Sequence, residues 1–428
     1  MKLKGLRWYV LGLVGIATVI NYIDRNALAI MWPGISEDLG MDKNDYAFIL
    51  SFFMVAYALG QSVFGKIFDV IGTRISFVLS ILLWSFSVAL HAVAKTATSF
   101  GIFRFTMGFG EAGNWPGATK SNAEWFPIRE RALAQGLFNA GASIGAIVSA
   151  PLIAVLYTSM GWQWTFVAIA VVGSLWVIPW LFIYKKGPSE HPWITENEQK
   201  YILDGQKETE TQEEEEENPE EEVAMSWKQL LSYRQSWAII LSRFFVDPVW
   251  WLFVSWLPIY LAEEFGFDVK EIGLFAWVPY VGAAVGSVVG GWVSGLFLQS
   301  GRSVNFARKF TITLGGIIML PSLLLTAGAA TPLKAVLLIA LILFGFQMAI
   351  GNIQTLPSDF FGRKNVGSLS GLGGTAAVLG VLVTIWLVPI ITVESYVPFF
   401  ILGAILVPLG IGMIWLLGGN IKKIDSQK

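Results

Sequence analysis

Apolar segments of about 20 residues or more recur along the whole length of this sequence. Each is long enough to cross the hydrocarbon core of a bilayer as a helix. Only 14% of the residues are charged, whereas soluble proteins average about 25%. We therefore predict an all-α membrane protein with twelve transmembrane helices. The expected spans cover residues 8–31, 46–68, 75–95, 98–120, 132–157, 163–184, 236–263, 271–297, 307–329, 333–356, 364–391 and 395–417.

Basic residues are distributed unevenly between the loops on the two sides of these spans. The loops on one side, with both termini, hold most of the lysines and arginines, whereas the other side holds only Lys43, Lys95, Lys270 and Lys334. Basic loops stay in the cytoplasm, so we expect both termini and the central loop to be cytoplasmic. We expect a multi-pass monomer in the inner (plasma) membrane, with the lipid bilayer around it.

A long polar loop separates the first six spans from the last six. We expect an N-terminal half at residues 1–190, a cytoplasmic acidic linker at 191–235 and a C-terminal half at 236–428. Within the linker, residues 208–222 read ETETQEEEEENPEEE, a block of like charge that repels itself and is typical of disorder. We interpret the block as a solvated linker; a regulatory role is the alternative.

The two halves carry related segments. Residues 124–136 read EWFPIRERALAQG and residues 359–371 read DFFGRKNVGSLSG, and both follow the fourth span of their half. Nine residues after the last glycine of each segment comes another glycine, Gly145 or Gly380. This pattern predicts two pseudo-symmetric six-helix halves, the arrangement of a transporter that rocks around a central site.

Six charged residues lie well inside the expected spans, away from their ends, and their charges cancel. Arg104 and Glu111 are seven residues apart, so they share one helix face about 10 Å apart along the axis. Charged side chains at membrane depth cost roughly 2.5 kcal/mol or more and usually face a cavity or a partner. Our hypothesis is that protonation of one carboxylate frees an arginine for a substrate carboxylate; ion pairs that only lock helices together are the alternative. The six residues are Asp24, Arg25, Arg104, Glu111, Arg243 and Asp247.

Polar and aromatic residues in the same spans are candidate contacts for the hydroxyl groups and ring of a sugar. Each of them is also a candidate for packing or for a hydrogen bond between helices. The candidates are Tyr22, Tyr57, Gln61, Asn139, Trp250, Gln347 and Asn352.

The loop between the second and third spans predicts a gate. It reads GKIFDVIGTR over residues 65–74, with Gly65 and Gly72 allowing close approach and with Asp69 and Arg74 as charged contacts. By contrast, the chain has no Walker A motif, no G-x-S-x-G and no H-E-x-x-H. Cysteine is absent and there are two histidines. We predict no enzyme activity, no cofactor, no metal and no nucleic-acid partner.

The segment GKIFDVIGTR resembles the G-x-x-x-D-R-x-G-R-R signature of the major facilitator superfamily, departing from it at Val70 and Thr73. NYIDR at residues 21–25, with Arg104 and Glu111, is similar to the anion:cation symporter family. Residues 110–146, 243–261 and 347–374 resemble the bacterial hexuronate transporters.

This resemblance implies proton-driven import of galacturonate or glucuronate by alternating access. The alternatives are another organic anion such as an aldonate, and a sensor that binds a sugar acid without carrying it. The resemblance further implies proton coupling by Asp24 and Glu111, with Arg25 and Arg104 as carboxylate or charge-pair partners. It implies sugar contacts from Tyr22 and Tyr57 in the first half, and from Arg243, Trp250, Gln347 and Asn352 in the second.

Overall fold

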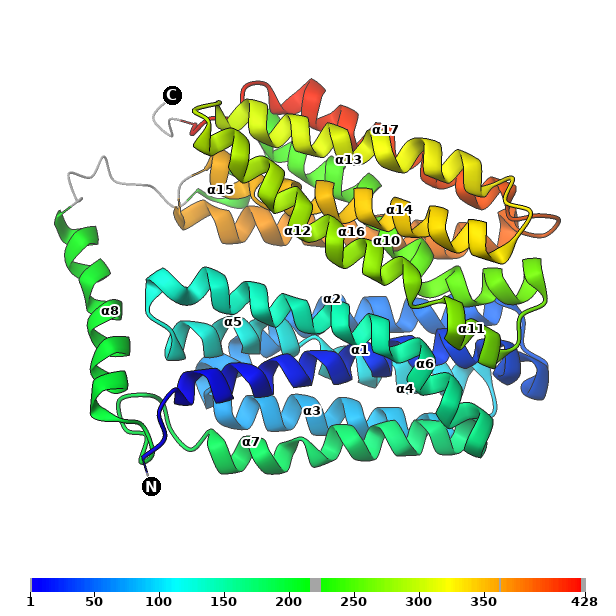
Figure 1. Ribbon diagram of the computed structural model, residues 1–428, viewed down its shortest axis with the longest axis horizontal. Coiled ribbons are helices and arrows are strands. Elements are labelled where there is room, and N and C mark those ends of the chain that lie inside the picture. Colours follow the sequence, from blue (N-terminus) through cyan, green and yellow to red (C-terminus); the bar gives the residue numbers. More distant parts are fainter. Residues whose placement is uncertain (1, 216–224, 362, 425–428) are drawn as a thin grey trace. The chain divides into compact units, whose positions relative to one another are not determined.

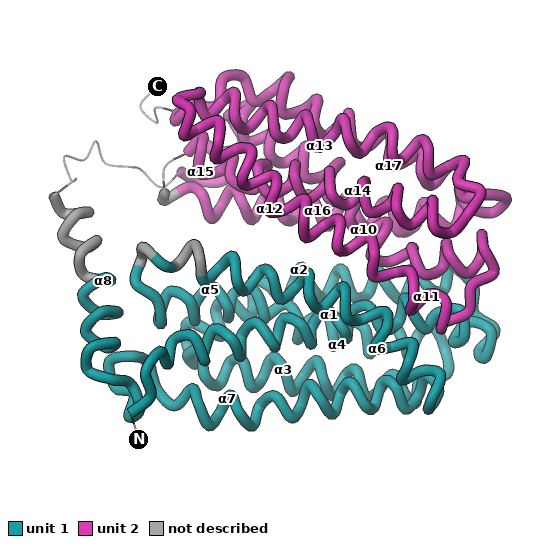
Figure 2. Tube along the Cα trace, in the orientation of Figure 1, with its two compact units in different colours: residues 1–219 teal, residues 220–428 magenta. Residues whose placement is uncertain are grey.

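Helices make up most of the chain (Figure 1). The computed structural model describes residues 2–215, 225–361 and 363–424, and within them the only β-type contact is an isolated bridge between Leu3 and Ile194. Helices are the expected form for apolar segments in lipid, because the bilayer core offers no partner for an exposed backbone N–H or C=O. Two compact units make up the chain, residues 1–219 and residues 220–428 (Figure 2).

The first unit holds the first six expected spans. The span expected at 98–120 is two helices, α4 and α5, interrupted at Ala112 and Gly113 directly after Glu111. The fifth and sixth spans share the helix α6, and Gly161 separates them with a φ of 75° that side chains rarely allow. The helices are α1 (Leu6–Leu39), α2 (Lys43–Ile71), α3 (Thr73–Leu90), α4 (Ala97–Glu111), α5 (Asn114–Trp125), α6 (Ile128–Leu175) and α7 (Val177–Ile183).

The second unit holds the last six expected spans. Two of them are interrupted: one at Ala276 and Trp277, and one at Gln354 and Thr355. The helices are α10 (Arg234–Phe265), α11 (Val269–Phe275), α12 (Val278–Gln299), α13 (Val304–Thr326), α14 (Pro332–Ile353), α15 (Leu356–Phe360), α16 (Arg363–Ile391) and α17 (Val397–Gly418).

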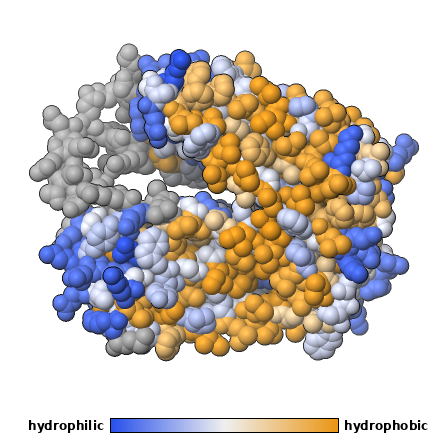
Figure 3. Space-filling view, viewed as in Figure 1, coloured by the Kyte–Doolittle hydropathy of each residue, from blue (hydrophilic) through white to orange (hydrophobic). Residues whose placement is uncertain are grey.

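The number of spans agrees with the prediction of twelve. Among the described residues, ten helical segments are long and apolar enough to cross a bilayer. One of them, Ala134–Ile183, has 50 residues, and at about 1.5 Å per residue it is long enough for two crossings. The twelfth span is α4 with α5, which carries Arg104 and Glu111. On the face that Figure 3 shows, apolar side chains cover much of each unit, and hydrophilic ones gather toward the helix ends.

Close helix contacts confirm that the two units are repeats of one design. A Cβ on Gly60 would meet the carbonyl of Phe109, and a Cβ on Gly286 would meet the carbonyl of Phe344, which lies 235 residues after Phe109. In the same way Gly145 lies against the carbonyl of Val19. The second unit has the matching contact: Gly380, 235 residues after Gly145, lies against the carbonyl of Phe244, 225 residues after Val19.

These contacts set the register between the halves. Residues of α1 correspond to residues of α10 that are 225 positions later, and residues of α4 and α6, with α5 between them in the chain, correspond to residues 235 positions later. The same offset holds for α3, because Gly110 lies against the backbone of Trp84 as Gly345 lies against that of Met319. By this register Arg25 corresponds to Trp250, and Glu111 corresponds to Phe346.

The segment expected to be a linker is partly folded. It contains α8 (Glu196–Glu215) and α9 (Trp227–Leu230). The buried carboxylate of Glu198 accepts hydrogen bonds from the backbone N–H groups of Gly5 and Leu6 at 2.8 and 3.0 Å, which attaches α8 to the start of α1. The acidic block 208–222 was expected to be disordered; α8 includes it as far as Glu215, which is consistent with the good helix propensity of glutamate. Its remaining residues, 216–222, lie outside the described residues.

Candidate functional site

The first half contains a buried ion pair in the middle of its spans. The Nε and Nη2 atoms of Arg25 donate to Oε2 of Glu111 at 3.0 and 2.9 Å. Arg25 comes from α1 and Glu111 from the last residue of α4, so the pair joins two helices. The two side chains are only 7% and 0% exposed. Breaking a buried pair by removal of one partner leaves an uncompensated charge, which costs about 3–5 kcal/mol.

Aromatic rings surround the guanidinium group of Arg25. Its Cζ atom lies 5.1 Å from the ring centre of Tyr22, 5.4 Å from that of Phe53 and 4.9 Å from that of Tyr57. Nη2 also donates to Oδ1 of Asn21 at 3.2 Å. These contacts orient the guanidinium group and add cation–π attraction.

Arg104 contacts α1 and not the glutamate on its own helix. Its Nη1 atom donates to the backbone carbonyl of Arg25 at 3.3 Å, while its buried Nε and Nη2 atoms have no hydrogen-bond partner among the described residues. Arg104 and Glu111 lie seven residues apart on α4, as expected, but they do not pair with each other. The ion-pair partner of Glu111 is Arg25, whose side chain reaches across from α1. Arg104 is therefore a buried cation with unused donors.

Asp24 is buried beside this pair, and neither of its carboxylate oxygens has a hydrogen-bond partner among the described residues. Its neighbour in sequence, Arg25, points to Glu111 instead. The Trp84 indole on α3 lies next to Asp24 and interacts with its carboxylate, but its buried N–H does not have the geometry of a full hydrogen bond. The second oxygen of Glu111, Oε1, is likewise unpaired. Buried polar atoms are normally satisfied, so this cluster has unused capacity to bind protons, water or an anion.

The second half has aromatic rings where the first has its ion pair. Trp250 on α10 stacks on Phe346 of α14, with ring centres 5.6 Å apart and an interplanar angle of 25°. Tyr280 packs edge-on against the same indole at 6.0 Å. Gln347, the next residue after Phe346, is partly exposed. A flat, half-exposed tryptophan beside an amide is a suitable surface for a sugar ring.

Arg243 and Asp247 pair within α10, about two turns and one turn before Trp250, respectively. Nε of Arg243 donates to Oδ2 of Asp247 at 3.1 Å, and Nη2 donates to Oδ1 at 2.7 Å. The side chains are 18% and 13% exposed. Residues 243, 247 and 250 follow the spacing of one helix face, so the ion pair and the indole lie along one stripe of α10.

Three predicted contacts lie away from these clusters. Asn352 is buried and hydrogen-bonded to the Met348 carbonyl at 3.1 Å, and its Oδ1 accepts from Arg308 at 3.2 Å. Asn139 is exposed and accepts from Gln135 at 3.4 Å. Gln61 is exposed on α2. The structure brings together Tyr22, Asp24, Arg25, Tyr57, Arg104 and Glu111 in the first half, and Arg243, Trp250 and Gln347 on α10 and α14 in the second.

The predicted gate lies at the end of α2 and the start of α3. Gly72 joins the two helices with a φ of 87°, and Nη2 of Arg74 donates to the carbonyl of Leu181 at 3.0 Å. Asp69 is largely exposed and pairs with Lys120 of α5 at 2.9 Å. Gly65 has open space around its Cα.

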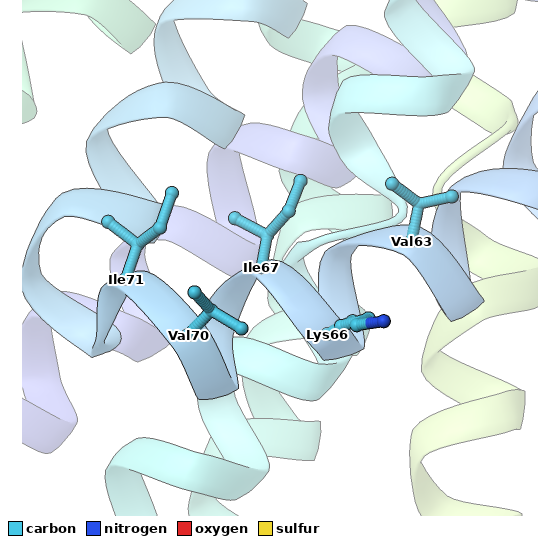
Figure 4. Close-up of a pocket in the computed structure, with 5 residues that line it drawn as sticks. All are labelled: Val63, Lys66, Ile67, Val70 and Ile71. Atoms are coloured by element: carbon cyan, nitrogen blue, oxygen red, sulfur yellow. The ribbon is translucent and has the colours of Figure 1, made fainter.

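An apolar hollow of about 430 Å³ lies along the same end of α2 (Figure 4). Val63, Lys66, Ile67, Val70 and Ile71 line it, all from this one helix (Figure 4). Four of the five are aliphatic, so the hollow does not offer the polar groups that a sugar acid requires.

Thr73 takes the place of a signature arginine and contacts a carboxylate through its hydroxyl group. Its Oγ1 donates to Oε1 of Glu124 at 2.8 Å, and the Tyr184 hydroxyl donates to Oε2 of the same carboxylate. In the second half the corresponding residues are Arg308 and Asp359, which form an ion pair at 2.9 Å.

Sequence reasoning missed four residues that act at these sites. Trp84 and Phe53 looked like ordinary packing residues, because an aromatic side chain in an apolar span carries no signal of its neighbours. Lys120 lies at the end of an expected span and Glu198 lies in the expected linker. Charged residues are common in both places, so neither position indicated a specific contact. Among the described residues, no group of three His, Asp or Glu side chains is placed to hold a metal ion.

Comparison with known proteins agrees with this arrangement. A family model described as Major Facilitator Superfamily matches residues 14–385. The chain is 34% identical over 428 residues to the hexuronate transporter of Escherichia coli (strain K12), covering 99% of this chain and 96% of the relative. It is 36% identical over 321 residues to the galacturonate transporter of Dickeya chrysanthemi, covering 74% and 90%.

Among solved structures, a D-xylose-proton symporter matches with a TM-score of 0.72 at 13% identity, covering 97% of this chain and 98% of that one. At this identity the likeness concerns the fold. The family model, the near full-length relatives and the twelve spans in two repeated halves lead to one conclusion: the chain belongs to the major facilitator superfamily.

Proposed function

We propose that this protein imports a hexuronate, galacturonate or glucuronate, together with protons across the inner membrane by alternating access. The hexuronate and galacturonate transporters among its relatives support the substrate class. The single observation that carries the mechanism is the Arg25–Glu111 pair beside the unpaired carboxylate of Asp24.

Arg25 is the proposed binding residue for the substrate carboxylate. Two of its nitrogens converge on one oxygen of Glu111, and an incoming carboxylate presents two oxygens to the same group. The rings of Tyr22 and Tyr57 hold the guanidinium group in place during this exchange. Arg104, with two unpaired donors, balances the charge of whichever carboxylate remains.

Protons enter the proposed mechanism at Glu111 and Asp24. When the substrate carboxylate takes Arg25, Glu111 loses its cation and becomes a buried, uncompensated anion unless it binds a proton. Asp24, already without a hydrogen-bond partner, is the second proton site. The loaded protein is then close to neutral, which is the condition for moving a charged solute through a low-dielectric barrier.

The sugar ring is proposed to contact aromatic and amide side chains. Tyr22 and Tyr57 supply hydroxyl groups in the first half, and Trp250 with Gln347 supplies a flat face and an amide in the second. Arg243 is proposed to be a further substrate contact. The segment from Gly65 to Arg74 keeps its proposed role as a gate, now with Lys120 as the partner of Asp69.

Uptake of labelled galacturonate and glucuronate into proteoliposomes tests this function. We expect accumulation under an inward proton gradient and loss of accumulation when a protonophore is added. Gluconate, an aldonate, serves as the alternative substrate in parallel. Binding of a sugar acid without any accumulation would identify a sensor and contradict transport.

The coupling role is tested separately with Glu111→Gln. The amide mimics a permanently protonated carboxyl, so exchange of internal for external substrate is expected to persist while proton-driven accumulation is lost. Glu190→Gln, an exposed residue paired with Lys186, is the matched control and is expected to behave as wild type. Unchanged accumulation by Glu111→Gln would exclude Glu111 from coupling.

A further inference from the structure

We propose that Asp247 selects substrates by charge: it neutralises Arg243 and thereby restricts the protein to sugar acids with one carboxylate. Sugar diacids, which carry a second carboxylate, are excluded as long as this ion pair is intact. The inference rests on the proposed function, in particular on Arg243 as a substrate contact.

Asp247 occupies both hydrogen-bond donors on one edge of the Arg243 guanidinium group, Nε and Nη2. Two of its nitrogens donate to the two different oxygens of Asp247, at 3.1 and 2.7 Å. This two-bond arrangement is the strong form of an arginine–carboxylate contact. A second substrate carboxylate would have to compete with Asp247 for these same donors.

The surroundings hold Arg243 where it is. A Cβ on Gly373 of α16 would lie 3.3 Å from Cδ of Arg243, so the arginine stem packs closely against that helix. Trp250 lies further along the same stripe of α10 and stacks on Phe346. An arginine released from Asp247 would therefore stay beside the proposed sugar surface.

The corresponding positions of the first half indicate that the fold does not require this pair. By the register between the halves, Arg243 and Asp247 correspond to Thr18 and Tyr22. Thr18 accepts a hydrogen bond from Nδ2 of Asn114 at 3.0 Å, so a neutral contact serves at that position. An ion pair here is a property of the second half alone.

Charge accounting supplies the reason for selection. Deep in the first half, two arginines balance two carboxylates, and deep in the second half Arg243 balances Asp247. A monoanion with one proton adds no net charge. A dianion with the same proton leaves one negative charge, which is costly inside a membrane protein. Removing the charge of Asp247 would supply the missing positive charge.

The experiment compares two acids that share one carbon skeleton, galacturonate with one carboxylate and galactarate with two. Uptake of both is measured in proteoliposomes for the wild type and for Asp247→Asn. We expect the ratio of galactarate to galacturonate uptake to rise about tenfold in the variant, the effect of one partly screened unit charge nearby. Gluconate and glucarate form a second pair, so the test does not depend on the identity of the sugar.

Two further variants separate selection from a structural role. Arg243→Gln combined with Asp247→Asn removes both charges and is expected to restore the wild-type ratio. Glu190→Gln breaks an exposed pair of the same spacing, with side chains 61% and 67% exposed, and is expected to leave the ratio unchanged. If Asp247→Asn lowers both uptakes equally, the pair is structural and the proposal is overturned.

A measurement on the wild type alone covers the case in which Asp247→Asn does not fold. Galactarate is expected to compete for galacturonate uptake at least about tenfold more weakly than unlabelled galacturonate does. Equal competition would contradict the proposal. Failure of the proposed function has a different result: neither sugar acid of either pair accumulates in the wild type.

Discussion

The two halves of this protein place opposite chemistry at corresponding positions. In the middle of the spans, the first half has the Arg25–Glu111 ion pair where the second has the Trp250–Phe346 stack. At the helix ends the order reverses. There the first half has a threonine hydroxyl on Glu124, and the second has an arginine on the matching aspartate.

This difference separates what the fold requires from what the function requires. Both halves make helix–helix contacts at these positions, so a contact is part of the shared design. The ionic character is not, because at each of these two sets of matching positions one half has an uncharged contact instead. A buried ion pair is weak support for stability, so the presence of Arg25–Glu111 where the second half has stacked rings supports the proposed role in binding and coupling.

The largest expected effect comes from breaking the Arg25–Glu111 ion pair of the first half. Arg25→Ala removes the proposed carboxylate ligand and leaves Glu111 buried without its cation. We expect uptake to fall by at least about 100-fold and stability to fall by about 3–5 kcal/mol. Arg25→Gln combined with Glu111→Gln should recover the stability, measured by thermal unfolding, while uptake stays absent. Recovery of uptake in the double variant would show that the pair is only structural.

The matching change in the second half is Trp250→Ala. It removes a ring that stacks on Phe346 and leaves every mid-span charge in place. We expect galacturonate affinity to weaken about tenfold, from the loss of roughly 1–2 kcal/mol of aromatic contact, with proton coupling retained. Concentration dependence of uptake with and without a proton gradient measures both. Loss of coupling with normal affinity would reverse the assignment of roles to the halves.

A third change makes the helix ends alike. Thr73→Arg introduces the residue type that the second half has at Arg308, facing Glu124 as Arg308 faces Asp359. A new ion pair of roughly 1 kcal/mol should slow opening at this end and lower the rate of uptake about fivefold. Thr73→Val, which removes only the hydroxyl group, is the control of similar size. Initial rates that equal those of wild type would exclude a gating role for this contact.

A smaller effect on stability is expected from breaking the contact between Glu198 of α8 and the start of α1. The carboxylate of Glu198 accepts from the backbone of Gly5 and Leu6 and contacts Arg7 at 3.4 Å. Glu198→Gln should lower stability by about 1 kcal/mol, as for loss of a charged helix cap. Glu196→Gln, an exposed residue of the same helix, is the control. Equal Tm values for the two variants would show that α8 does not stabilise α1.

The smallest expected effect is a pH dependence in the segment after α7. Burial lowers the pKa of His191, whose Nδ1 accepts from the Trp193 N–H at 3.1 Å while Nε2 lies 2.8 Å from the Ile183 carbonyl. The unfolded chain binds a proton more readily than this folded site. The site's contribution to stability is therefore present above the ordinary histidine pKa of about 6.5 and is lost as the pH falls. His191→Gln should reduce the fall in Tm between pH 7 and pH 5; an unchanged fall would exclude His191 as its source.

The spans and the repeat were predictable because they depend on local composition. Apolar length decides which segments cross the bilayer, and the paired segments 124–136 and 359–371 already indicated two related halves. The break after Glu111 was not predicted, because glycine and proline, which follow at Gly113 and Pro116, are also frequent within continuous transmembrane helices. The helix α8 was not predicted, because its last turns belong to the acidic block, whose composition is typical of disorder.

The candidate site divides in the same way. The sequence alone determined which charged residues must be buried, because few charges occur in the spans and each needs a reason to be there. It also determined that Arg243 and Asp247 can pair, since four residues form one helical turn. Only the tertiary structure decided that Glu111 pairs with Arg25 and not with Arg104, and that Asp24 is left unpaired. The physical reason is that a side chain's partner across helices depends on where α1 and α4 lie in the bundle, which leaves no trace in the spacing of residues along either helix.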